Sequence, residues 1–172
     1  PESFCRIKHM SQVRGVYTGV MNSQKFLCGS VAETVALGFK IGTKLRGGEV
    51  FELVSDLGGG KTTLVRGMVQ GFGSPDPVAS PSFTISYVYS RPDGKQFHHF
   101  DFYRLDDAGI VGNELAEVEE DADAVVAVEW GEVVHNILPS SRVVVTIAAT
   151  DEEDRKITFE YPDSYSYLFQ KA

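Results

Sequence analysis

The sequence predicts a single α/β domain of three layers, in which helices cover a mixed β-sheet that carries antiparallel hairpins. The chain has 172 residues, 42% of them hydrophobic, which is enough for one good core but hardly for two. Residues 124–128 form a short run of apolar side chains, as is typical of a central strand buried on both faces. A strand, a glycine-rich turn and a helix also follow one another between residues 50 and 70.

The first helix is expected to begin at Ser30. Ser30 and Glu33 have the spacing of a capping box. Apolar residues then recur at roughly helical intervals, at Val31, Val35, Ile41 and Leu45. Gly47 and Gly48 are expected to end this helix. Because structured sequence is predicted to start here, residues 1–29 are interpreted as an N-terminal extension of unknown role.

The rest of the chain is expected to supply one more strand–helix unit and two hairpins. A buried strand at 50–54 precedes a helix from Thr62 to about Gln70, which Gly71 and Gly73 are expected to close. The hairpins are expected to pair residues 83–90 with 95–103 and residues 142–148 with 156–161. The domain then spans residues 30–162, and residues 163–172 are interpreted as a C-terminal tail.

The charge of the chain is negative and unevenly distributed. A formal charge of −8 and a pI near 5.0 argue against a broad basic face for phosphate backbones, so we do not expect this chain alone to bind nucleic acid directly. Residues 105–123 contain eight carboxylates and neither Lys nor Arg. This acidic segment is either a solvated helix face or a docking surface for a basic partner, and both can hold at once.

The spacing of the cysteines and the hydropathy of the chain indicate the cellular compartment in which the protein works. Cys5 and Cys28 lack a CxxC pairing, which suggests neither a disulfide framework nor a zinc site. Residues 1–30 lean basic but lack the apolar stretch of a secretory signal, and no stretch approaches the length needed to span a membrane. We therefore expect a soluble cytoplasmic protein with no membrane partner.

The most specific motif is a glycine-rich loop, Ser55-Asp56-Leu57-Gly58-Gly59-Gly60-Lys61-Thr62-Thr63, between a predicted strand and a predicted helix. In such a loop, consecutive N–H groups and a helix N-terminus bind phosphates, and glycine lets the backbone approach closely. Lys61 is expected to reach the β- and γ-phosphates, and the Thr62 hydroxyl to bind Mg²⁺. The sequence therefore predicts a P-loop NTPase-like domain with a site for ATP and Mg²⁺.

A magnesium site also needs an acid, usually at the C-terminal end of a neighbouring buried strand. Glu129 follows the apolar strand at 124–128 and is the favoured metal ligand. Asp101 is the competitor, and it would otherwise act on the γ-phosphate side, through water or from a second layer of contacts. The plain alternative for Asp101 is an ion pair with nearby Arg104.

A pair of histidines and a tryptophan lie next to these two acids in the sequence. His98 and His99 occupy successive strand positions and must face opposite sides, so they do not form a local metal pair and are interpreted as structural. Trp130 follows Glu129, and a tryptophan there is more often a core or interface residue than a platform for base stacking.

Four blocks of the chain resemble, in order, the TsaE family of small bacterial P-loop proteins. They are DLGGGKTTL at 56–64 followed by Arg66-Gly67, SPSFT at 80–84, HFDFYRL at 99–105, and VEWGE at 128–132 with Ile137-Leu138-Pro139 after it. With Thr34 and Leu37 in the first helix and Arg155 near the end, the resemblance spans roughly residues 30–160.

The resemblance implies a Mg-dependent ATPase that joins TsaB and TsaD, hydrolyses ATP weakly alone and faster with those partners, and supports formation of threonylcarbamoyladenosine in tRNA. The tRNA would be met only through the complex. The resemblance further implies phosphate and catalytic roles for Lys61, Asp101 and Glu129, and magnesium binding by Thr62 and Glu129. It implies nucleotide contacts for Asp56, Leu57, Gly58, Gly59, Gly60, Lys61, Thr62, Thr63, Thr34 and Arg155.

Two departures from the family pattern and two rival functions affect these expectations. Ser82 stands where the family usually has threonine, and it keeps a hydroxyl. Ser55 stands where the family has glycine, which would cost about 1 kcal/mol if the position required a positive φ. A small-molecule kinase is the first rival, but the chain lacks an arginine-rich lid segment, since its arginines are scattered singly. The second rival is a module that binds nucleotide without hydrolysing it.

Overall fold

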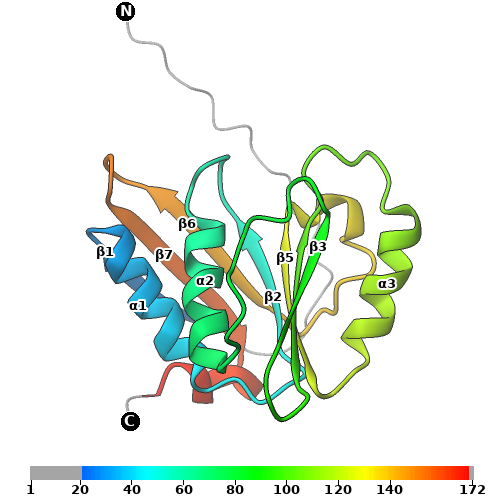
Figure 1. The fold of residues 1–172 in the computed structure, drawn as a ribbon. Helices are drawn as coiled ribbons and strands as arrows, with labels where there is room; N and C mark the ends of the chain where they lie inside the picture. The colour runs from blue at the N-terminus through cyan, green and yellow to red at the C-terminus, as the bar shows by residue number, and fades with distance from the viewer. Residues whose placement is uncertain (1–20, 171–172) are drawn as a thin grey trace, which may run out of the picture.

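The computed structural model describes residues 21–170, which form one seven-stranded sheet in the order β1-β7-β6-β2-β5-β4-β3 (Figure 1). The strands are β1 (Met21–Cys28), β2 (Val50–Val54), β3 (Ser86–Ser90), β4 (Gln96–Asp101), β5 (Ala124–Glu129), β6 (Val143–Ala149) and β7 (Arg155–Pro162). The helices are α1 (Val31–Gly42), α2 (Lys61–Phe72) and α3 (Gly109–Glu119), with 3₁₀ helices η1 (Gly131–Val134) and η2 (Asp163–Leu168).

The centre of the sheet is parallel and its margins are antiparallel. Strand β2 pairs in parallel with both β5 and β6, and β4 pairs in parallel with β5. Antiparallel pairing joins β3 to β4 and β6 to β7, so both predicted hairpins are confirmed. Every residue of β5 is buried, as expected for a central strand covered on both faces. The predicted mixed sheet is therefore confirmed.

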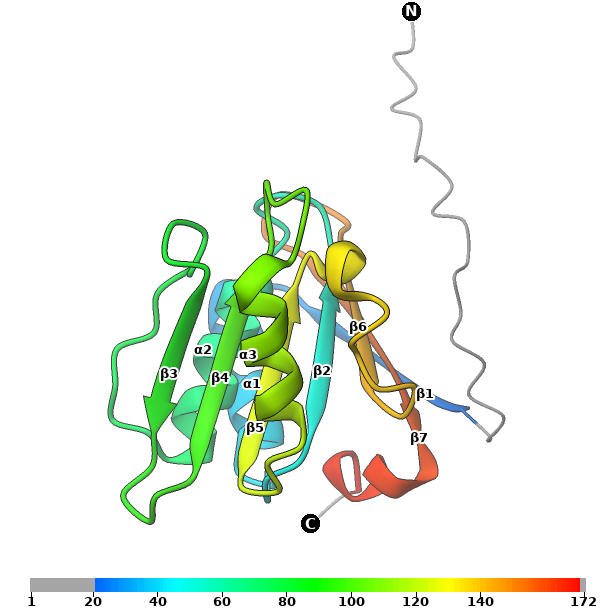
Figure 2. The ribbon, with the colours of Figure 1, turned by 90° about the vertical axis from the view of Figure 1, so that its right-hand side faces the viewer.

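Helices cover the two faces of the sheet, which gives three layers. Helices α1 and α2 pack on one face, and α3 lies on the other (Figure 2). The core is divided accordingly: Leu37 and Met68 belong to the first half, and Phe100 and Leu115 belong to the second. The predicted three-layer α/β architecture is confirmed by this arrangement.

Helices α1 and α2 pack closely because glycines face each other across their interface. A Cβ added at Gly38 would lie 2.3 Å from the carbonyl oxygen of Leu64, and one at Gly67 would lie 2.1 Å from the oxygen of Val35. Gly71 has the same restriction, since its Cβ would lie 2.1 Å from a backbone oxygen of α1. Gly71 is therefore an interior packing residue of α2, and the prediction that it helps to end the helix was wrong.

The ends of the helices differ from the prediction in other places. Helix α1 ends at Gly42, capped by Thr43, several residues before the expected stop at Gly47 and Gly48. Helix α2 runs to Phe72, and Gly73 caps it with a φ of 96°, a conformation that glycine adopts without strain. The Ser30 cap was predicted correctly, because the Ser30 hydroxyl accepts a hydrogen bond from the backbone N–H of Glu33 at 3.2 Å.

The expected start of the fold near Ser30 was wrong. Strand β1 pairs with β7 along its whole length, from Met21 opposite Pro162 to Cys28 opposite Arg155. Most side chains of β1 are exposed, as suits a strand at the edge of the sheet, so the strand shows little apolar alternation in the sequence. Its place is fixed by backbone pairing with β7, which a local pattern does not reveal. The rest of the expected extension, residues 1–20, lies outside the described residues.

Residues 163–172 are predicted to be a C-terminal tail, but the part of this segment that the structure describes, residues 163–170, packs against the rest of the fold. Leu168 in η2 is buried, and the Lys44 side chain donates hydrogen bonds to the carbonyls of Leu168 at 3.1 Å and Gln170 at 2.6 Å. The Tyr165 hydroxyl donates to the carbonyl of Gly48 at 3.3 Å. These contacts hold the described part of the C-terminal segment against the loop between α1 and β2.

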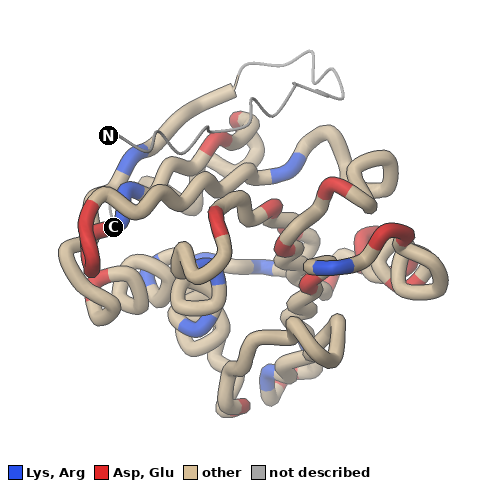
Figure 3. The backbone as a smooth tube through the Cα atoms, turned by 90° about the horizontal axis from the view of Figure 1, so that it is seen from above, with Lys and Arg blue, Asp and Glu red and all other residues tan. Residues whose placement is uncertain are grey.

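Most of the acidic segment is exposed to solvent, although only its middle part is helical. Helix α3 carries Glu114, Glu117 and Glu119, and the other five carboxylates of the segment flank it. Seven of the eight are exposed, whereas Glu119 is only partly exposed. Figure 3, which looks down on the molecule from the top of Figure 1, shows acidic residues on α3 at the right. The solvated-face interpretation is confirmed, and the docking surface stays a prediction. No helix within residues 21–170 has the length and apolar character that a membrane crossing requires.

Candidate functional site

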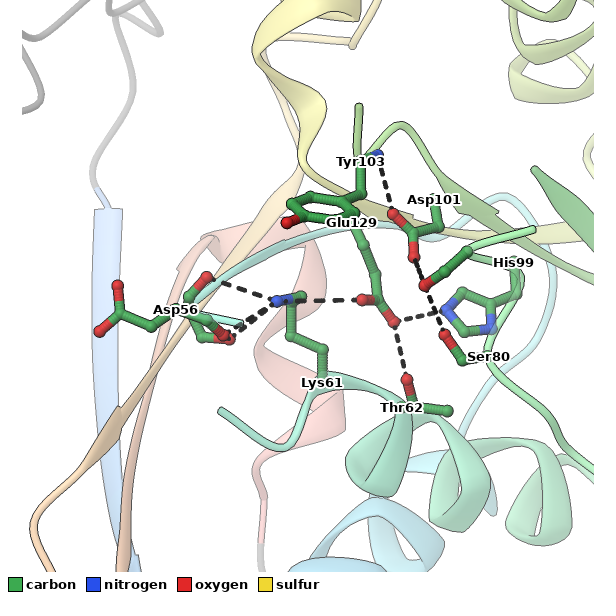
Figure 4. A network of polar contacts seen from close by, with 10 residues as sticks. Asp56, Lys61, Thr62, Ser80, His99, Asp101, Tyr103 and Glu129 are labelled. Carbon is green, nitrogen blue, oxygen red and sulfur yellow. Dashed lines mark hydrogen bonds and ion pairs between the residues drawn. The ribbon is translucent and has the colours of Figure 1, made fainter. Parts of the chain in front are cut away.

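The predicted site residues come together where the parallel strands end. The glycine-rich loop leaves the C-terminal end of β2, while Asp101 and Glu129 close β4 and β5. Registers place Leu53 of β2 opposite Glu129, and Asp101 opposite Glu129 on the other side. In open α/β sheets, ligands bind outside the carboxyl ends of the strands. Figure 4 shows these side chains converging above the N-terminus of α2.

Glycines shape the loop itself. Gly58 and Gly60 have φ values of 74° and 108°, which side chains rarely tolerate, and Gly60 immediately precedes α2. Helix α2 therefore begins with Lys61 and presents its unpaired N–H groups towards the loop. Among the described residues, positive φ at other residue types occurs at Ile85, Arg104 and Trp130. Ser55 is not one of these, so the strain considered for it does not arise.

Lys61 is buried, with 5% of its surface exposed, and its ammonium group lies among oxygen atoms of the loop. It contacts Ser55 Oγ at 3.0 Å, and the carbonyl oxygens of Ser55 and Asp56 at 3.3 Å each. The Trp130 ring centre lies 4.5 Å away. Burial lowers the pKa of Lys61, and the carboxylates of Glu129 and Asp101 oppose that shift.

Glu129 is the acid nearest to the start of α2. It is 3% exposed, and its Oε1 accepts a hydrogen bond from the Thr62 hydroxyl at 3.3 Å. Its Oε2 lies 3.9 Å from Lys61 Nζ. The structure thus brings Lys61, Thr62 and Glu129 together, as their predicted shared role in binding a nucleotide and a metal ion requires.

Asp101 is buried beside this group but has other partners. Its carboxylate accepts hydrogen bonds from the Ser82 hydroxyl at 2.5 Å and from the backbone N–H of Tyr103 at 2.9 Å. The Arg104 guanidinium lies over the rings of Tyr103 and Phe83, at 5.0 Å and 5.6 Å from the ring centres. No ion pair between Asp101 and Arg104 occurs among the described contacts, so that alternative was wrong.

His99 belongs to the site, although the sequence interpretation gave it only a structural place. It is fully buried, and its Nε2 lies 2.8 Å from Glu129 Oε1. A signal was available, because His99 and Asp101 are two residues apart on one strand and so share a face. His98 points to the other face, where its Nε2 lies 3.2 Å from the Gln96 side chain. The prediction that the two histidines face opposite sides is confirmed.

Two residues that are predicted to contact the nucleotide, Arg155 and Thr34, lie at the edge of the candidate site. Arg155 donates from Nε to the Gly59 carbonyl at 3.0 Å and from Nη1 to three carbonyls of the β6–β7 turn, so it ties that turn to the loop. Thr34 is buried in α1, and its hydroxyl donates to the Ser30 carbonyl at 3.3 Å. Its described hydrogen bond does not reach the loop. Leu57 is largely exposed at the loop's tip.

The residues present fit a nucleotide with a magnesium ion. Within residues 21–170 there is no cluster of three or more His, Cys, Asp or Glu side chains that could hold a metal ion. Mg²⁺ needs no such cluster, because it is commonly held by one or two protein oxygens together with phosphate oxygens and water. Thr62 Oγ1 and Glu129 Oε1, 3.3 Å apart, are protein oxygens of this kind.

A family model described as "Threonylcarbamoyl adenosine biosynthesis protein TsaE" matches residues 28–157 of the chain. This chain belongs to the TsaE family. The resemblance inferred from the four sequence blocks is therefore confirmed.

Relatives that are named TsaE agree with this assignment, and a solved structure shares the fold. A protein named "tRNA threonylcarbamoyladenosine biosynthesis protein TsaE" from Mycobacterium leprae is 39% identical over 119 residues, which cover 64% of this chain and 73% of that protein. The protein of the same name from Bacillus subtilis is 34% identical over 130 residues, covering 74% and 78%. The crystal structure of Bacillus subtilis YdiB superposes with a TM-score of 0.71 at 28% identity, covering 87% of this chain and 93% of that one. The predicted P-loop NTPase-like fold is confirmed.

Proposed function

We propose that this chain is a Mg-dependent ATPase that works with TsaB and TsaD to support formation of threonylcarbamoyladenosine in tRNA. The relatives named above carry the tRNA modification in their names. The partnership with TsaB and TsaD is an expectation from the family resemblance. The proposal includes a cytoplasmic location and contact with tRNA only through the complex, because a chain of charge −8 has no evident surplus of cations for RNA.

One observation carries the ATPase part of the proposal: Lys61, Thr62 and Glu129 converge at the end of the glycine-rich loop. The distances are 3.3 Å from Thr62 Oγ1 to Glu129 Oε1 and 3.9 Å from Lys61 Nζ to Glu129 Oε2. A buried ammonium group beside a hydroxyl–carboxylate pair is the combination that phosphate and Mg²⁺ together require. A plain ion pair between Lys61 and Glu129 would be expected to be shorter than 3.9 Å.

In the proposed mechanism the chain positions the phosphates and compensates their charge. Lys61 and the backbone N–H groups of the loop bind the phosphate oxygens, while Thr62 and Glu129 would hold the metal ion. A bound ion would supply positive charge against the negative charge that develops on the transferred phosphoryl group. Asp101 lies beside this position and would act on the γ-phosphate side, through water or from a second layer of contacts.

No side chain of the described site is an evident general base for the attacking water. Asp101 is already engaged with Ser82 and Tyr103, and Glu129 is assigned to the metal. The proposal therefore predicts slow hydrolysis by the chain alone, and faster hydrolysis when a partner completes the site.

The test is phosphate release from Mg-ATP by the purified chain, with and without TsaB and TsaD. We expect stimulation by the partners and its loss in Lys61→Ala. Lys40→Ala is the matched control, because it removes an exposed lysine from α1 and leaves the loop intact.

The possible results separate the proposal from its rivals. Equal hydrolysis with and without the partners would contradict the partnership. Nucleotide binding without any phosphate release, even in the complex, would favour a binding module. ADP formation that depends on an added nucleoside or sugar would favour a kinase.

A further inference from the structure

The loop satisfies the ammonium group of Lys61 with its own oxygens. An ammonium group has three donor hydrogens. Three loop acceptors lie within hydrogen-bond distance of Lys61 Nζ: the Ser55 hydroxyl at 3.0 Å and the carbonyls of Ser55 and Asp56 at 3.3 Å. The Ser55 hydroxyl is the nearest of the three. A phosphate oxygen that binds Lys61 must therefore displace one of them.

The same hydroxyl also helps to fix the Asp56 carbonyl. Ser55 Oγ donates to the Asp56 carbonyl oxygen at 3.0 Å, and the backbone N–H of Gly59 donates to the same oxygen at 3.0 Å. Loops that bind phosphate do so with free N–H groups. The Gly59 N–H is occupied inside the loop, so this donor becomes available to a phosphate only when its bond to the Asp56 carbonyl opens.

Packing places the Ser55 side chain directly against the loop backbone. A Cβ added at Gly59 would lie 2.5 Å from Ser55 Oγ and 2.8 Å from Ser55 Cβ. The serine side chain thus fills space beside Gly59 that a glycine at position 55 would leave open.

We propose that Ser55 sets the nucleotide affinity of this site, because its hydroxyl competes with phosphate oxygens for Lys61 and stabilises the arrangement in which the loop bonds to itself. The inference rests on the proposed function, since it concerns the same loop. Ser55 is accordingly an affinity-determining residue, and it opposes nucleotide binding.

Removal of the hydroxyl tests the inference. Ser55→Ala removes Oγ and introduces no glycine flexibility, and position 55 has no positive φ to exclude alanine. We expect the Kd for Mg-ADP, measured by calorimetry, to fall about tenfold, which is the order of effect expected for one hydrogen bond to a charged group. ADP suffices, because its β-phosphate is one that Lys61 is proposed to bind.

Ser74→Ala is the matched control. Its hydroxyl bonds to Asp76 beyond the far end of α2, so its removal deletes a serine hydrogen bond without touching the loop. We expect the Kd of this variant to equal that of the unmodified chain. Ser55→Gly serves as the second variant if Ser55→Ala does not fold, and it is expected to shift the Kd in the same direction.

A second measurement needs no nucleotide. Hydrogen exchange of the Gly59 amide, followed by NMR on the full chain, is expected to become severalfold faster in Ser55→Ala and to stay unchanged in Ser74→Ala. The reason is that Ser55 Oγ holds the carbonyl that protects this amide.

The outcomes separate this inference from the function on which it rests. If the unmodified chain binds Mg-ADP and Ser55→Ala binds it equally or more weakly, the inference is overturned. Weaker binding would make the hydroxyl a ligand of the nucleotide instead of a competitor. If neither the chain nor its variants bind Mg-ADP, the proposed function fails and the inference fails with it.

Discussion

Two buried glutamates at opposite ends of the sheet differ in how fully their carboxylates are bonded. Glu49, just before β2, is 1% exposed and accepts hydrogen bonds from the backbone N–H groups of Arg46 at 2.8 Å and Gly47 at 2.9 Å, and from the Tyr167 hydroxyl at 2.5 Å. Glu129, at the end of β5, is 3% exposed, but its contact with Thr62 is 3.3 Å long and that with Lys61 is 3.9 Å long.

The difference separates a carboxylate that builds the fold from one that is available to a ligand. Both oxygens of Glu49 are bonded to donors fixed by the backbone or by packing. Burial raises the pKa of Tyr167, and so does its bond to Glu49, so this hydroxyl stays protonated and donates. Glu129 has one short contact, to His99 at 2.8 Å, and its Oε2 faces Lys61 at a distance beyond hydrogen bonding. A buried acid with unused acceptor capacity is a candidate for function.

The largest expected effect is a loss of ATP hydrolysis when Glu129 is replaced. Glu129→Gln keeps the shape of the side chain and removes its charge, so we expect ATP hydrolysis by the complex to fall by about a hundredfold or more, as for loss of a group that stabilises transition-state charge. The melting temperature should stay close to that of the unmodified chain. Full activity in Glu129→Gln, with loss in Asp101→Asn, would reverse the metal assignment.

Glu49→Gln should lower the stability of the chain and leave its turnover unchanged, which is the reverse of the result expected for Glu129→Gln. An amide in place of this carboxylate directs an N–H group at donors, so a buried donor loses its partner and we expect the free energy of unfolding to fall by about 2–3 kcal/mol. Denaturant unfolding measures this loss. The hydrolysis rate per folded molecule should not change. A stability equal to that of the unmodified chain would contradict the structural role of Glu49.

A smaller effect is expected at His99, which holds Glu129 in place. His99→Phe keeps an aromatic ring in the core and removes the 2.8 Å contact with Glu129. Partners behind a metal ligand commonly contribute about tenfold or more to metal affinity, so the Mg²⁺ concentration for half-maximal hydrolysis should rise by about tenfold. His98→Phe is the control, because His98 lies on the other face of β4. An equal shift in both variants would show that the effect comes from packing.

A further effect, on the pH dependence of stability, is expected at Glu119, a third acid that completes the comparison. Its Oε1 is buried without a hydrogen-bond partner among the described residues. Burial raises its pKa from 4.5 to about 7, and Arg142 opposes the shift. The folded chain thus binds this proton more tightly than the unfolded chain, and the free energy of unfolding should fall as pH rises from about 4.5 to about 7.

Glu119→Gln removes the ionisation at this position and should flatten that part of the stability profile. Thermal unfolding at several pH values, compared between the unmodified chain and the variant, measures the difference. Identical profiles would mean that Glu119 ionises in the folded chain as it does in the unfolded one.

The parts of the site that lie close together in the sequence were predictable. Gly58, Gly60, Lys61 and Thr62 belong to one loop and one helix start, whose spacing follows from the geometry that phosphate binding demands. Glu129 was predictable too, because an acid after an all-apolar run marks the end of a central strand. The sequence placed His99 on the same face as Asp101, but its contact with Glu129 depends on β4 and β5 being neighbours, which no pattern within β4 states.

The sequence by itself determined the local elements of this protein: the strand, loop and helix that begin the site, the apolar central strand, and both hairpins with their turns. Those features depend on backbone conformation and on the spacing of apolar residues, which a short segment carries within itself. Tertiary structure alone decided the place of β1, the attachment of η2 through Glu49 and Tyr167, and the contact between His99 and Glu129. Each of these joins residues that are far apart in the chain, so it depends on which strands pair and in which order, and that is settled only when the whole core is assembled.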